Sequence, residues 1–119
     1  MSLDVYLYQP QICPHCGGKL SDDETCLFSD NVTHNLTKMA DMAGIYKHLW
    51  RPDELDINRA GQLIEPLRLG LDKLEAEPQA FKEYNPANGW GSYEGLVSFV
   101  RSYMEACIAN PAARVSVSR

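Results

Sequence analysis

NVTHNLTKMADMAGIYKHLWRP, residues 31–52, is the stretch that decides the fold. Apolar residues recur along it at helical spacing and predict one long helix with a buried stripe. The stripe consists of Leu36, Met39, Ala40, Ala43, Tyr46 and Trp50. Thr33 or Asn31 can cap this helix, Gly44 weakens its middle, and Arg51-Pro52 ends it. The opposite face is expected to carry His34, Lys38, Asp41, Ile45 and His48.

Three segments outside this helix have strand patterns. Residues 3–8 alternate, with Leu3, Val5 and Leu7 on one face, which predicts a half-buried strand. Residues 24–32 are a weaker strand candidate, and the tail at 114–118 alternates again. Because chain ends that are both strands commonly pair, we expect the first and last strands to be neighbours in one small antiparallel sheet.

The remaining segments are helical. Leucines at helical spacing predict a second helix over residues 59–76, in which Pro66 either kinks the helix or restarts it. Residues 78–84 predict a short helical turn, and Ser92 can cap a third helix that stops at Asn110-Pro111. The sequence therefore predicts an α+β fold, with an antiparallel sheet of about three strands packed against three main helices.

Length and composition limit the function. The 119 residues predict a single domain over 1–119, with a cysteine-containing loop at 12–26. A formal charge of −5 argues against a nucleic-acid partner, because binding to phosphate backbones needs clustered Lys and Arg. No apolar run approaches the ~20 residues of a membrane span, and the N-terminus has no signal pattern. We therefore expect a cytoplasmic protein without a membrane partner.

Cysteines near the start of the chain indicate a metal site. Cys13 and Cys16 are two residues apart, next to His15 and before two glycines, so their thiolates can bind one tetrahedral zinc ion from one side. Cys26, His15 or a histidine from elsewhere, for which His34 is best placed, would complete the ligand set. The alternative is a loop of reduced thiols that resembles half of a zinc ribbon. Cys107 falls on an apolar helical stripe and is expected to be a small core residue.

Polar residues beside helix starts indicate a binding site. His34 and Asn35 follow the capping Thr33, where free backbone N–H groups favour an anion or a carboxamide. Asn88 and Trp90 lie in a glycine-flanked loop, and an indole there can stack on a ligand ring. The alternatives are plain helix capping at His34 and a core role for Trp90. Trp50-Arg51 has the same two interpretations. The favoured one is a core aromatic residue, and the alternative is a pair that holds a ligand.

Catalytic motifs are absent from the sequence. It has no Gly-x-Ser-x-Gly, P-loop, His-Glu-x-x-His or Gly-x-Gly-x-x-Gly pattern, and its carboxylates are scattered. No acid/base pair is evident. The sequence therefore does not predict an enzyme.

Several segments resemble an uncharacterised family of small phage- and prophage-encoded proteins. The matching segments are THNL (33–36), AGIY (43–46), LWRP (49–52), LIEPLR (63–68), NGWGSYEG (88–95) and VSVSR (115–119). The resemblance covers most of the chain from residue 31 onward and implies expression in an infected bacterium. It carries no activity. It also implies that the Cys13–Cys16 segment is a feature of this member rather than of the family.

These observations lead to one main hypothesis and two alternatives. The main hypothesis is a non-enzymatic accessory binding protein that sequesters a small molecule or blocks a host defence factor. Its ligand-binding residues would be His34, Asn35, Arg51, Asn88 and Trp90. The first alternative is a small zinc- or histidine-dependent enzyme, with zinc held by Cys13, Cys16, Cys26 or His15. The second alternative is a structural adaptor between proteins.

Overall fold

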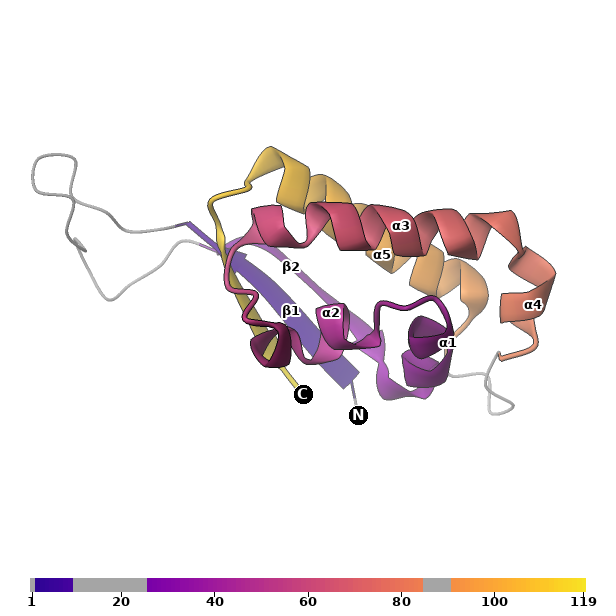
Figure 1. The fold of residues 1–119 in the computed structure, drawn as a ribbon. Helices are drawn as coiled ribbons and strands as arrows, with labels where there is room; N and C mark the ends of the chain where they lie inside the picture. Colours follow the sequence, from indigo (N-terminus) through magenta and orange to yellow (C-terminus); the bar gives the residue numbers. More distant parts are fainter. Residues whose placement is uncertain (1, 10–25, 85–90) are drawn as a thin grey trace, which may run out of the picture.

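The fold is built on a three-stranded antiparallel sheet. The computed structural model describes residues 2–9, 26–84 and 91–119. Its strands are β1 (Ser2–Tyr8), β2 (Cys26–Thr33) and β3 (Arg114–Ser118), in the order β2-β1-β3 (Figure 1). Val5 at the centre of β1 faces Asp30 on one side and Val117 on the other. The α+β class and the pairing of the first and last strands are therefore confirmed.

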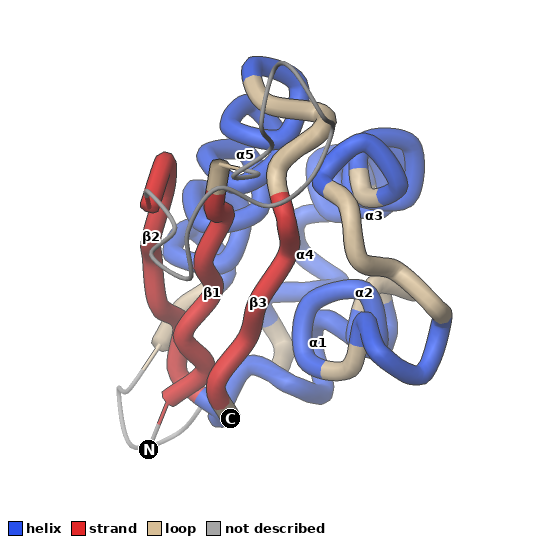
Figure 2. The backbone as a smooth tube through the Cα atoms, turned by 90° about the vertical axis from the view of Figure 1, so that its left-hand side faces the viewer, coloured by secondary structure: helices blue, strands red, loops and turns tan. Residues whose placement is uncertain are grey.

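The sheet has one buried face and one partly exposed face. Leu3, Val5 and Leu7 are completely buried, as their alternation predicts. The intervening Tyr6 and Tyr8 lie on the other face and stack on each other with ring centroids 5.8 Å apart. Figure 2 shows the strands side by side at one side of the helices. The core thus lies between the sheet and the helical layer.

The predicted long helix is broken into short pieces, which corrects the sequence-based expectation. The pieces are a 3₁₀ turn η1 (His34–Leu36), α1 (Thr37–Met42) and α2 (Tyr46–Trp50). Gly44 adopts φ +81° between α1 and α2, a conformation that favours glycine. This turn redirects the chain, so Ile45 is buried in the core, whereas the periodicity had placed it on the exposed face. Tyr46, predicted as core, is only partly buried.

The second helical region begins after two short turns. The two 3₁₀ turns are η2 (Pro52–Leu55) and η3 (Ala60–Gln62), and the helix that follows them is α3 (Ile64–Ala76). Pro66 lies in the first turn of α3, where backbone N–H groups have no partner within the helix. The N–H that proline lacks therefore costs α3 no hydrogen bond. Of the two readings of Pro66, the restart is therefore confirmed.

The last two helices close the core. α4 (Pro78–Lys82) is the predicted short turn, and α5 (Tyr93–Ala109) is capped by Ser92, whose Oγ accepts from the Gly95 N–H at 3.1 Å. Tyr103 of α5 stacks on Phe28 of β2 with centroids 5.8 Å apart. Cys107 is completely buried, and burial raises the pKa of its thiol to about 12. The predicted core role of Cys107 is confirmed.

None of the helices in the described ranges combines the length and the apolar character that a membrane crossing requires.

Candidate functional site

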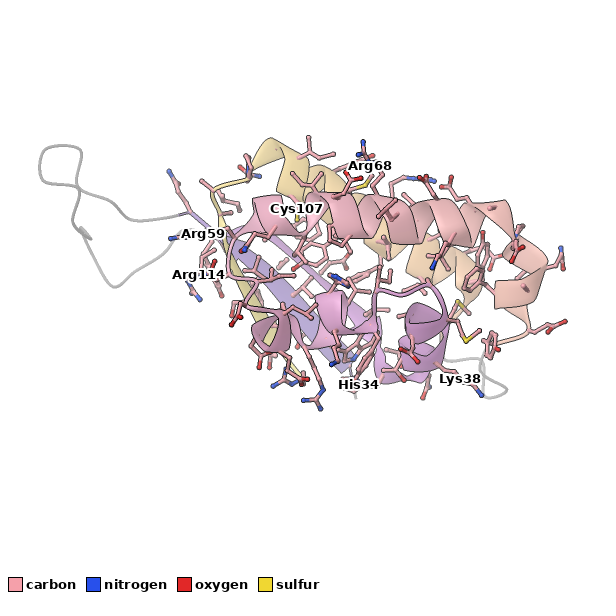
Figure 3. All side chains as sticks on the ribbon, in the orientation of Figure 1. His34, Lys38, Arg59, Arg68, Cys107 and Arg114 are labelled. Atoms are coloured by element: carbon pink, nitrogen blue, oxygen red, sulfur yellow. The ribbon has the colours of Figure 1, made fainter. Side chains whose placement is uncertain are left out.

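The candidate site is centred on a hydrogen bond between the core and the surface. Trp50 at the end of α2 is buried, with 2% of its surface exposed. Its indole Nε1–H donates to Nδ1 of His34 over 2.7 Å, and His34 itself is partly exposed. Figure 3 shows His34 at the edge of the molecule below α2. Residues 16 positions apart in the chain are thus joined at one point.

This bond orients the His34 ring. Because Nδ1 accepts a hydrogen bond, the proton of the neutral imidazole is on Nε2. Nε2 has no hydrogen-bond partner among the residues that the structure describes. His34 therefore presents an unused N–H donor whose direction is set by a buried indole.

Aromatic and cationic side chains extend the site from Trp50 along α2. Tyr46 stacks on Trp50 with centroids 5.7 Å apart and an interplanar angle of 21°. The Tyr46 hydroxyl accepts from Nε of Arg51 at 3.2 Å, and Arg51 also donates to Glu54 at 3.2 Å. These two contacts raise the pKa of Arg51, the Tyr46 hydrogen bond most, so Arg51 stays charged. We call His34, Tyr46, Trp50 and Arg51 the His34 cluster.

The end of the chain meets the His34 cluster. Arg119 follows β3 and donates through Nη1 to the Trp50 carbonyl at 2.9 Å and to Asp53 at 3.2 Å. The hydrogen bond from Arg119 lowers the pKa of the Asp53 carboxyl. This contact spans 69 positions of the sequence, which is why periodicity and motifs gave no sign of it.

Two of the predicted ligand-binding residues, His34 and Arg51, belong to the His34 cluster. Asn35 is next to His34 and exposed, and its backbone N–H donates to the Thr33 side chain at 3.3 Å. Thr33 therefore caps this turn, as predicted. Asn88 and Trp90 lie outside the described residues. Tyr46 was missed as a site residue because its helical spacing assigned it to the core.

Gly91, shortly before α5, packs against Thr33 and Leu36, which lie on either side of His34 in the sequence. It has φ +102°, and a Cβ at this position would lie 2.6 Å from Cγ2 of Thr33 and 3.0 Å from Leu36. The backbone at Gly91 thus packs against the residue before His34. Gly91 is the described residue next to Trp90 in the sequence, and the neighbourhood of Trp90 and His34 stays a prediction.

The predicted zinc ligands are described only in part. Cys26 is an exposed free thiol at the start of β2, where it donates to the Phe28 carbonyl at 3.3 Å. Cys13, His15 and Cys16 lie outside the described residues. Within 2–9, 26–84 and 91–119, no three His, Cys, Asp or Glu side chains are grouped to hold a metal ion. Zinc binding therefore remains a prediction.

No protein-family model matches the chain, and neither the curated proteins nor the solved structures contain a match.

Proposed function

We propose that the chain is a non-enzymatic binding protein and that the His34 cluster is its contact site. The observation that supports this function most is the 2.7 Å hydrogen bond from Trp50 to His34. It leaves the Nε2–H donor of His34 free to bind an acceptor, such as a carbonyl, a carboxylate or a phosphate oxygen. A ring held by a buried partner loses little freedom on binding, which favours affinity.

The other members of the cluster suit the same role. Tyr46 offers a partly exposed ring beside the His34–Trp50 pair, and Arg51 offers a cation held by Tyr46 and Glu54. Aromatic residues and arginine are the side chains that contribute most at recognition sites. An acceptor group at His34 with a flat or apolar part against Tyr46 is the ligand chemistry that this arrangement favours.

The biological setting is part of the proposal. From the resemblance to phage and prophage proteins, we propose that the chain acts in the cytoplasm of an infected bacterium. In that setting the ligand would be a small molecule of the host or a host defence protein. A contact site without an acid/base pair supports sequestration or blocking rather than turnover.

Native mass spectrometry of protein purified from expressing bacteria tests this function. His34→Glu is the informative variant, because a glutamate carboxylate can still accept the Trp50 hydrogen bond but has no N–H to donate to a ligand. Arg68→Gln on α3 is the control, since Figure 3 shows Arg68 on the opposite edge from His34. We expect a co-purifying species on the wild type and on R68Q and its loss from H34E. Equal occupancy of all three proteins would contradict the proposal.

A zinc site is a second candidate, and the sheet register favours it. Tyr8 at the end of β1 pairs with Cys26 at the start of β2. The described residues on either side of the segment that carries Cys13, His15 and Cys16 are therefore neighbours in the sheet, and one of them is Cys26. Three thiolates and one imidazole are a known ligand set for structural zinc.

A further inference from the structure

A hollow on the other side of α2 is not used by the His34 cluster. It lies between α2 and α3 and has a volume of about 650 Å³. This volume is within the range of small-molecule sites, roughly 300–1,000 Å³. Its walls are mainly apolar and include Ile45, Pro66 and Leu69, of which Leu69 is 56% exposed. We call it the α2–α3 hollow.

A second hollow continues along α3. It has a volume of about 410 Å³ and is lined by Met42 of α1, Phe81 of α4 and Tyr84. Lys73 lines both hollows, which makes them neighbours along α3. Met42 is 52% exposed, so each hollow has a large apolar side chain open to solvent beside Lys73. Exposed apolar side chains at a concave surface are typical of ligand grooves.

Lys73 is the charged group between the two hollows. Its Nζ lies over the turn at Gly44, 3.7 Å from where a Cβ at that glycine would be. Its ammonium has no ion pair or hydrogen bond with another described residue. The carboxylate of Glu65, which also lines the α2–α3 hollow, is bound by Arg68, so its charge is already offset. Asp72 and Glu77 are exposed to water at the rims.

His48 is a further ionisable group in the wall of the α2–α3 hollow, beside Lys73, Glu65 and Asp72. Its Nδ1 atom is buried and has no hydrogen-bond partner among the described residues. Burial lowers the pKa of His48, and the nearby Gly44 backbone opposes this shift only in part. The ring is therefore neutral at pH 7 and offers one donor and one acceptor. A neutral ring and an ammonium in one wall provide donors for the oxygens of an anion.

We propose that the α2–α3 hollow binds a small amphiphilic carboxylate, with its carboxylate at Lys73 and His48 and its apolar chain along Leu69 and Ile45. The apolar walls favour a hydrocarbon part, and the unpaired ammonium at the junction favours a negative head group over a neutral or positive one. A chain longer than this hollow would continue past Lys73 toward Met42 and Phe81.

Titration of the full-length protein with sodium octanoate, monitored by ¹H–¹⁵N NMR, tests this site. Octylamine and octanol are the matched probes, with the same chain and a cationic or neutral head. We expect octanoate to shift the amide signals of residues 43–48 and 65–73. Octanol should bind there more weakly, and octylamine should not bind.

Lys73→Gln removes the charge and keeps most of the side-chain stem. We expect it to weaken the binding of octanoate about five-fold, which is the upper range for an exposed ion pair. The binding of octanol should be unchanged. Lys82→Gln on α4 is the control, because Lys82 pairs with Glu94 and lines neither hollow. The proposal is overturned if octylamine or octanol binds as tightly as octanoate. It is also overturned if K73Q has no effect or if the shifted signals lie elsewhere.

Discussion

At the scale of single residues, His34 has two separable roles. Its Nδ1 satisfies the N–H of a tryptophan that is 98% removed from solvent, and buried donors are rarely left unpaired. Its Nε2 faces away from that bond and is available to a partner. A substitution that keeps the acceptor therefore separates the structural role from the proposed binding role.

His34→Ala should lower the free energy of unfolding by about 1–3 kcal/mol, because the Trp50 N–H loses its acceptor inside the protein. H34Q should cost less, since its amide oxygen can replace Nδ1. Urea denaturation followed by Trp fluorescence measures both values. Arg68→Ala, at an exposed position, should stay within about 0.5 kcal/mol of the wild type. Equal stability of H34A and the wild type would show that the hydrogen bond from Trp50 to His34 contributes nothing to the free energy of unfolding.

His48 predicts a pH dependence of stability. Its pKa in the folded protein is below the ordinary value of 6.5, mainly because the ring is buried. As the pH falls below 6.5, the unfolded chain binds a proton that the folded chain does not, so stability decreases. His48→Gln should reduce this loss between neutral pH and about pH 5 in thermal melts. Asp53, whose pKa is lowered by Arg119, affects stability only at more acidic pH, below 3.8. If the stability of H48Q depended on pH as strongly as that of the wild type, the attribution of this loss to His48 would be contradicted.

At the scale of elements, the turn at Gly44 determines the orientation of α2 relative to α1. A glycine inside a helical pattern costs only about 1 kcal/mol, so the sequence did not distinguish a weakened helix from a broken one. The break changes the phase of the apolar stripe, and this explains the errors at Ile45 and Tyr46. It also places His48 in the α2–α3 hollow and Trp50 next to His34. Both candidate sites thus depend on one residue with φ +81°.

Gly91→Ala should destabilise the protein by about 1–3 kcal/mol, because φ +102° is strained for any other residue. The added Cβ would also lie 2.6 Å from Cγ2 of Thr33, which forces the turn before His34 to move. Thermal melts measure the loss, and NMR signals of residues 33–36 should shift. Ser98→Ala, at an exposed position of α5, is the control and should change little. A G91A protein as stable as the wild type would show that this contact is not tight.

At the scale of the whole molecule, the sequence predicted the layers better than the site. Strand alternation and helical spacing are local, so the three strands and the α3 and α5 helices were found. The pairing of β1 with β3 followed from a general rule about chain ends. The contacts of His34 with Trp50 and of Arg119 with Asp53 join distant positions, and no local pattern encodes them. His34 and Arg51 were identified only because they are polar residues beside helix ends.

The cysteine-bearing segment gives a prediction for the intact chain. If Cys13, His15, Cys16 and Cys26 bind zinc, purified protein should contain about one zinc ion per chain. Cys26→Ser should lower the zinc content measured by elemental mass spectrometry, because it removes one thiolate. Cys107 is in the core and should not contribute. Zinc-free wild-type protein, prepared without chelators, would contradict the predicted site.

The antiparallel pairing of Asp4 with Ser118 leaves the first and last described residues beside each other, and Figure 1 shows the labels N and C close together. Arg119 contacts the carbonyl of Trp50. An affinity tag or fluorescent protein fused after Arg119 would therefore emerge next to the His34 cluster and crowd it. A reporter inserted between α3 and α4, at the far end of the helical layer, would leave that surface open. The choice of fusion point thus determines whether a binding assay can detect a partner at all.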